Sequence, residues 1–200
     1  MNSFKLILIR HGETIENASR IVQGQLSGHL SDKGREQAFR IAGRLKDEKF
    51  DAVYSSDLDR ALETAKILMK DRECLPIFAE KRLREQSFGI YEGKPVMAVL
   101  RQMKREKKDF TTFKPEGGES FEAFRNRVKL FLEEIKAKHS CNTVVLVTHF
   151  GVINILLSIF LNQDKMEISE SHIMNDTISI VSIDTSGKVK VETITGEENL

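Results

Sequence analysis

The chain has little cysteine, little proline and no tryptophan, and it has no excess of charge of either sign. Among its 200 residues are 2 cysteines and 3 prolines. Cys74 and Cys141 lack the spacing of a metal site or of a disulfide framework, so we interpret them as reduced thiols with a structural or incidental role. The 31 basic side chains balance the 30 acidic ones, for a net charge of +1. This balance gives no indication of a nucleic-acid partner.

The sequence also gives no indication of a segment for export or membrane insertion. The first apolar run, residues 4–9, is short, contains Lys5 and is followed by no small-residue cleavage site, so it predicts a strand and not a signal peptide. A second apolar stretch, 144–161, includes His149 and Asn154 and changes from β-branched to helical character, which favours a core strand followed by a buried helix over a membrane span. We therefore expect a cytoplasmic protein without membrane contact. Since no repeat or linker divides the chain, we expect one domain over residues 1–200.

What the chain does have is polar residues directly after apolar runs. Arg10 and His11 follow directly after the apolar run 4–9, and His149 follows directly after the β-branched run 143–148. In open α/β sheets the carboxyl ends of parallel strands meet at one edge, where ligands bind. The two histidines are thus expected to share one site.

A third strand is expected over 51–55, followed by a Ser56/Asp57 cap and a helix that carries Arg60 in its first turns. Backbone N–H groups and the helix dipole favour an anion at such a position. Guanidinium groups match phosphate as bidentate donors, so these arginines and histidines predict a pocket for a phosphate dianion.

The remaining pattern predicts a three-layer α/β/α sandwich, with a mostly parallel central sheet and an antiparallel C-terminal edge. Short strands are expected at 77–79, 178–183 and 189–194. Helices are expected after a Ser31 or Asp32 cap, over about 95–106, and after a Ser120 cap. The phenylalanines of that last helix, which include Phe121, Phe124 and Phe131, are expected in the core.

Four stretches taken together resemble the signatures of the histidine phosphatase superfamily, also called phosphoglycerate-mutase-like. They are Arg10-His11-Gly12-Glu13-Thr14, Ser55-Ser56-Asp57-Leu58-Asp59-Arg60-Ala61, Leu83-Arg84-Glu85-Gln86-Ser87-Phe88-Gly89 and Thr148-His149. No metal is expected, because Arg10, Arg60 and His149 already supply positive charge and the sequence shows no carboxylate cluster to hold Mg²⁺, and no cofactor is expected. The resemblance covers nearly the whole chain and implies a hydrolase for small phosphomonoesters. It implies that His11 becomes phosphorylated and that Glu85 is the general acid and base.

By the same resemblance, Arg10, Arg60 and His149 stabilise the transferring group, and Asn17, Gln23 and Gly24 bind the substrate. The loop that follows departs from the family pattern, since it reads Gln25-Leu26-Ser27-Gly28-His29 where the family commonly has Asp and then Pro-Leu-Thr. His29 is interpreted as a solvent-exposed residue, with contact to the substrate as the alternative.

Several alternatives stay open at this point. Glu92 competes with Glu85 as the proton donor, although a structural role is favoured for it. The protein could be a phosphoglycerate-type mutase or a non-catalytic phospholigand module. Segment 86–117, with basic residues at 101–108, is either a lid that attracts an anionic substrate or a solvated surface. The short connection from Glu85 to Gly117 resembles the phosphatase branch. Neither the particular phosphomonoester nor the choice between monomer and homodimer follows from the sequence.

Overall fold

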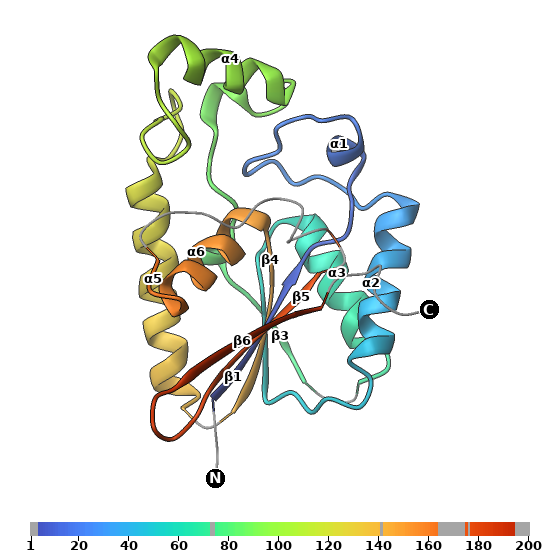
Figure 1. Ribbon diagram of the computed structural model, residues 1–200. Helices are drawn as coiled ribbons and strands as arrows, with labels where there is room; N and C mark the ends of the chain where they lie inside the picture. Colours follow the sequence, from blue (N-terminus) through green and yellow to red (C-terminus); the bar gives the residue numbers. More distant parts are fainter. Residues whose placement is uncertain (1–3, 73–74, 141, 164–174, 176, 195–200) are drawn as a thin grey trace.

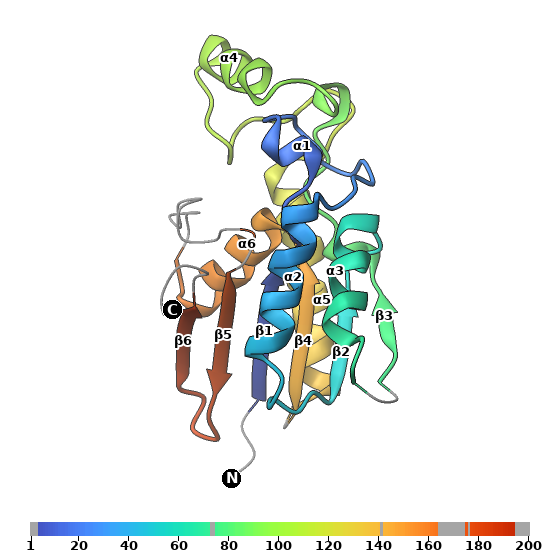
Figure 2. The same ribbon diagram turned by 90° about the vertical axis from the view of Figure 1, so that its right-hand side faces the viewer.

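The computed structural model describes residues 4–72, 75–140, 142–163, 175 and 177–194, so Cys74 and Cys141 lie outside the described residues. A six-stranded sheet with the order β3-β2-β4-β1-β5-β6 forms its centre (Figure 2). β1 to β4 run parallel, and β5 and β6 are antiparallel additions next to β1. The strands are β1 (Phe4–Arg10), β2 (Ala52–Ser55), β3 (Ile77–Ala79), β4 (Thr143–Thr148), β5 (Ile178–Ile183) and β6 (Val189–Ile194). The predicted sheet, with its antiparallel edge, is confirmed.

Helices cover both faces of this sheet, as a three-layer sandwich requires. Figure 1 shows the sheet edge-on, with α5 and α6 on one side and α2 and α3 on the other. The helices are α2 (Asp32–Arg44), α3 (Asp59–Met69), α5 (Phe121–Lys138) and α6 (Phe150–Phe160). Alternate strand residues face opposite layers: Leu6 and Leu8 of β1 join the core under α5 and α6, whereas Ile7 and Ile9 join the core under α2 and α3. No helix among the described residues is both long and apolar enough to cross a lipid bilayer.

Two small elements lie beyond the carboxyl ends of the parallel strands. They are α1 (Ile15–Ala18) and α4 (Val96–Glu106), which follows the 3₁₀ turns η1 (Lys81–Leu83) and η2 (Gly89–Tyr91) (Figure 1). A separate apolar cluster of Val22, Val99, Met103 and Phe113 packs the loop after α1 against α4. The elements beyond the strand ends therefore have a small core of their own.

Two predicted caps are found and one is not. The hydroxyls of Ser31 and Ser120 accept hydrogen bonds from backbone N–H groups at the starts of α2 and α5. The predicted Ser56/Asp57 cap of α3 is wrong, because the helix begins after Leu58 and has no side-chain cap. Both polar side chains are engaged elsewhere: Ser56 contacts His149, and Asp57 forms a bidentate ion pair with Arg84.

The register of the two central strands brings the two histidines together. Arg10 pairs with Thr148 in the parallel β1–β4 ladder, and the next amide, His11 N–H, donates to the Thr148 carbonyl at 2.9 Å. His11 and His149 thus leave adjacent strands at the same level. Their ring centroids are 5.1 Å apart in an edge-on arrangement.

Candidate active site

His11 has a fixed ring orientation at the end of β1. Its Nδ1 lies 2.8 Å from the Gly12 carbonyl oxygen, which accepts only, so the proton belongs on Nδ1. The opposite atom, Nε2, then carries a lone pair, and Arg60 Nε approaches it at 3.3 Å. The ring is buried. This tautomer is the one in which Nε2 can act as a nucleophile.

The surroundings also keep the His11 ring neutral. Burial lowers its pKa well below the ordinary value of 6.5, and the positive charges of Arg60 and Arg10 lower it further. Burial is the larger cause and the two arginines are the smaller one.

His149 lies behind His11 and is fully buried. Its Nε2 is 2.8 Å from the Ser56 hydroxyl, and we infer that this hydroxyl donates to Nε2 and leaves the proton on Nδ1. Among the described residues, Nδ1 has no hydrogen-bond partner. A buried N–H without an acceptor is unfavourable, and an anion bound beside His11 would supply one. His149 is not among the residues that line the cavity, so it would act from below the surface.

Arg60, in the first turn of α3, is almost completely buried and holds the loop after α1. Its guanidinium donates to the carbonyl oxygens of Gly24 at 2.8 Å and Ser27 at 3.0 Å, and also to that of Leu26. Burial lowers its pKa to about 10, so it is still charged at neutral pH. Arg60 thus has two functions in the structure: it places a positive charge next to His11, and it fixes the loop that contains Gly24.

Arg10 lines the floor of the cavity next to the start of α6. Its guanidinium carbon is 5.5 Å from the centre of the Phe150 ring. Together with Arg60 it gives the floor of the cavity a positive charge.

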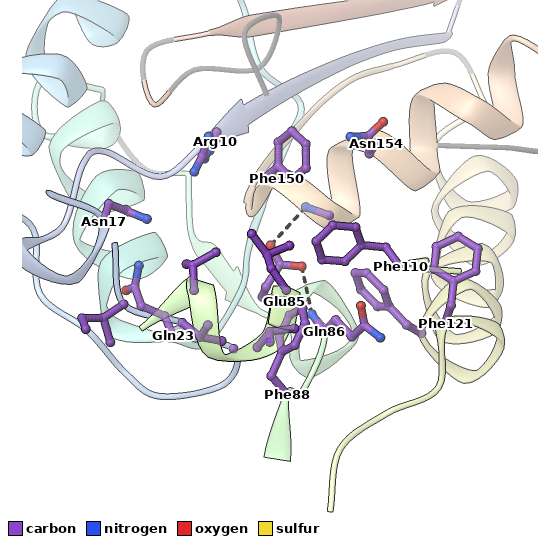
Figure 3. Close-up of a pocket in the computed structure, with 18 of the residues that line it drawn as sticks. Arg10, Asn17, Gln23, Glu85, Gln86, Phe88, Phe110, Phe121, Phe150 and Asn154 are labelled. Carbon is purple, nitrogen blue, oxygen red and sulfur yellow. Dashed lines mark hydrogen bonds between the residues drawn. The ribbon is translucent and has the colours of Figure 1, made fainter. Parts of the chain in front are cut away.

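Glu85 is held at the N-terminus of α6. Its two carboxylate oxygens accept backbone hydrogen bonds from Gly151 at 3.0 Å and from Gln86 at 2.9 Å (Figure 3). Gly151 leaves room for this carboxylate, since a Cβ atom there would lie 2.3 Å from a Glu85 carboxylate oxygen in its present position. The helix N-terminus therefore fixes the carboxyl group within the cavity that also contains His11.

These side chains line one cavity of about 570 Å³, which is a size typical of small-molecule sites. Figure 3 shows Asn17 and Gln23 on one side of Glu85 and Phe110 and Phe121 on the other. Seven of the eight residues that the sequence analysis assigned to the site line this cavity: Arg10, His11, Asn17, Gln23, Gly24, Arg60 and Glu85. His149 is the exception.

Asn17 and Gln23 present amide groups to the cavity. The Asn17 side-chain oxygen accepts from the backbone N–H and the hydroxyl of Thr14 in a capping box, so donation to a ligand falls to its Nδ2. Gln23 is buried, and its side-chain oxygen has no hydrogen-bond partner among the described residues.

Two carboxylates near the site have structural contacts. Glu92 accepts hydrogen bonds from the backbone N–H groups of Gln25 and Phe88 and from the Ser87 hydroxyl, and it does not line the cavity. Glu13 binds Lys33 at 3.0 Å. These contacts fit the structural role favoured for Glu92. His29 is exposed and is likewise not a lining residue.

Several supporting residues were missed by the sequence analysis. Arg127 donates to the Glu85 carbonyl at 2.8 Å and forms an ion pair with Glu119, and Gln25 also donates to that carbonyl, at 3.2 Å. Asn175 donates to the His11 carbonyl at 2.9 Å. No local pattern marks the contacts to the Glu85 and His11 carbonyls, since each of them joins residues far apart in the chain.

Segment 86–117 was expected to be either a lid or a solvated surface, and it contains both cavity-lining and exposed residues, so its action as a lid stays a prediction. Phe88, Val96 and Phe110 line the cavity, whereas the basic residues of 101–108 are exposed and none of them is a lining residue. The predicted Phe stripe of α5 is divided as well. Phe131 is buried in the core, whereas Phe121 is half-buried, packs against that core and also lines the cavity.

Comparisons with known proteins identify the family of the chain. The family model for the histidine phosphatase superfamily (branch 1) matches residues 6–194. Phosphoglycerate mutase-like protein 4 of Arabidopsis thaliana is 39% identical over 76% of this chain and 69% of its own length. The metal-independent phosphoserine phosphatase of the same plant is 34% identical over 90% of this chain and 76% of its own length. A solved structure from Escherichia coli, described as a putative alpha-ribazole-5'-P phosphatase, superposes with a TM-score of 0.85 at 26% identity and covers 98% of this chain and 97% of that one.

Proposed function

The chain belongs to the histidine phosphatase superfamily, and we propose that it hydrolyses small phosphomonoesters through a covalent phosphohistidine on His11. The observation that carries this proposal is the His11 ring. Its Nδ1–H is held by the Gly12 carbonyl, its Nε2 lies beside Arg60, and its pKa is lowered by burial and by the arginines. Relatives named as phosphatases support the same class of reaction.

In the first step, His11 Nε2 attacks phosphorus and the bond between phosphorus and the ester oxygen breaks. Glu85, in its protonated form, gives its proton to the departing oxygen, because an alkoxide leaves slowly without one. Arg10, Arg60 and the Nδ1–H of His149 stabilise the phosphoryl oxygens, and Asn17, Gln23 and Gly24 contact the substrate.

In the second step, water attacks the phosphohistidine. Glu85, now ionised, takes a proton from that water, the bond between phosphorus and Nε2 breaks, and inorganic phosphate leaves. The mechanism requires no metal, since the arginines already supply positive charge. Among the described residues, no group of three or more His, Cys, Asp or Glu side chains is arranged to hold a metal ion.

The residues that line the cavity favour hydrolysis over a mutase reaction. A phosphoglycerate mutase must hold a carboxylate and keep water away from the phosphohistidine. Apart from Arg10 and Arg60, the described lining residues include no lysine or arginine. We further propose that segment 86–117, which contributes Val96 and Phe110 to the wall, acts as a lid over the site.

The test is chemical trapping of the intermediate. Brief reaction with a labelled phosphomonoester, followed by denaturation, should leave acid-labile, base-stable phosphate on the wild type and none on His11→Ala. Full activity of His11→Ala would refute the proposed mechanism. Incubation with 3-phosphoglycerate, with and without 2,3-bisphosphoglycerate, tests the alternative, and fast isomerisation with negligible phosphate release from any monoester would favour the mutase.

A further inference from the structure

The outer part of the cavity differs in chemistry from its floor. Polar and charged groups lie around His11, whereas the walls beyond Glu85 are formed largely by apolar side chains. These side chains come from two separate parts of the chain: Phe88, Val96, Val99, Leu100 and Phe110 from segment 86–117, and Phe121, Phe124 and Phe150 from α5 and α6. Figure 3 shows Phe110 and Phe121 on the side of Glu85 away from Asn17 and Gln23.

Several of these apolar groups are exposed to water in the structure. Phe110 is 48% exposed, Leu100 37% and Val96 36%. They surround an open space in which a ligand would cover them, and burial of such apolar area is favourable.

The charges of this outer region also favour an apolar ligand over an anionic one. Asp109 lines it, and hydrogen bonds from the side chains of Thr111 and Thr112 lower the pKa of its carboxyl to about 2, so it is ionised. No lysine or arginine of segment 86–117 is a lining residue. A substrate with a second anionic group would thus meet a carboxylate there and no basic partner among the described lining residues.

We propose that this outer cavity selects phosphomonoesters of apolar alcohols and phenols and disfavours those that carry a second anionic group. The proposal rests on the proposed phosphatase function and specifies the class of its substrate. Phe110 is then a specificity-determining residue, because its ring would contact the apolar part of the ester.

The experiment compares three primary alkyl phosphates whose leaving alcohols are chemically alike: ethyl phosphate, 4-phenylbutyl phosphate and 5-phosphooxypentanoate. Burial of a phenyl ring should raise kcat/KM for 4-phenylbutyl phosphate about tenfold or more over ethyl phosphate. It should exceed that for 5-phosphooxypentanoate by a similar factor or more.

Two variants test the wall itself. Phe110→Ala should lower kcat/KM for 4-phenylbutyl phosphate about tenfold more than for ethyl phosphate. Phe39→Ala is the matched control, since Phe39 is 51% exposed on α2 and does not line the cavity, and it should change neither value.

The outcomes separate the two proposals. Phosphate release from none of the esters would overturn the phosphatase function and this inference with it. Hydrolysis with 5-phosphooxypentanoate as the equal or better substrate would overturn only the inference. Equal losses on both substrates in Phe110→Ala would also overturn it, because they would indicate a structural effect.

Discussion

Replacement of Glu85 by glutamine tests the proton donor with little change of shape. In the structure both carboxylate oxygens accept backbone hydrogen bonds, from Gly151 and from Gln86. A glutamine retains one acceptor oxygen, and its NH₂ group would oppose the other N–H. This mismatch should cost about 1–3 kcal/mol of stability, but it acts on every substrate alike.

The loss of the proton acts on substrates unequally. A general acid contributes about 10²–10⁴-fold when the leaving group is an alkoxide, and far less when the leaving group is a stable phenolate. We expect Glu85→Gln to lose about 10²-fold or more in kcat/KM on 4-phenylbutyl phosphate but about tenfold or less on 4-nitrophenyl phosphate. Since both esters carry a ring, the ratio of the two losses isolates the proton transfer.

Glu92→Gln is the matched control. Glu92 also accepts several hydrogen bonds in the same loop but does not line the cavity, so its replacement should lower activity on both esters by one common factor. Equal losses on both esters in Glu85→Gln would refute the acid role. A loss that depends on the leaving group in Glu92→Gln would assign that role to Glu92 instead.

Three further predictions concern activity without a metal, the stability of the fold in acid and two glycines of α2. Activity should survive extensive dialysis against EDTA, and loss on chelation with recovery on adding Mg²⁺ or Zn²⁺ would contradict the proposed mechanism. Burial lowers the pKa of His11 and of His149 well below 6.5, so unfolding takes up protons in acid. The contribution of the two histidines to the free energy of unfolding should be fully present above pH 6.5. Below that pH, the free energy of unfolding should fall by up to about 2.7 kcal/mol per pH unit. Urea denaturation at several pH values measures this fall. Gly34→Ala would place a Cβ atom 2.0 Å from the Glu13 carbonyl oxygen, whereas nothing lies within 4 Å of one at Gly43. Thermal unfolding should therefore show a loss of about 2 kcal/mol or more for Gly34→Ala and a gain of about 0.5–1 kcal/mol for Gly43→Ala.

The fold could be predicted because its signals are local. The β-branched run 143–148 and the mixed run 4–9 mark buried strands by composition alone, and the serine caps mark where α2 and α5 begin. The predicted cap of α3 was wrong because Ser56 stands at a position typical of a helix cap, but its side chain contacts His149. A competing tertiary contact of that kind leaves no trace in a local pattern.

The grouping of Arg10, His11, His149 and Arg60 could likewise be predicted, since each ends or follows a strand or lies at the start of a helix. The other polar residues of the site were expected from the family resemblance alone: Asn17, Gln23, Gly24 and Glu85. The apolar walls of the cavity could not be predicted from the sequence. Phe121 fits the apolar stripe of α5, and periodicity does not distinguish a side chain that faces the core from one that faces a cavity at the end of the helix. Phe110 lies in a turn with no periodic pattern, so only the three-dimensional arrangement places it in the site.

The environment of Arg60 explains how a buried cation serves this site. In the described part of the chain, its hydrogen bonds go to His11 and to carbonyl oxygens of the loop 24–27. Carbonyl groups satisfy its N–H donors but carry no net charge, whereas a carboxylate in the same place would neutralise it. The positive charge therefore remains to lower the pKa of His11 and to attract a phosphate dianion. One arrangement thus meets two needs of the proposed mechanism, a neutral His11 ring and a positive charge beside it.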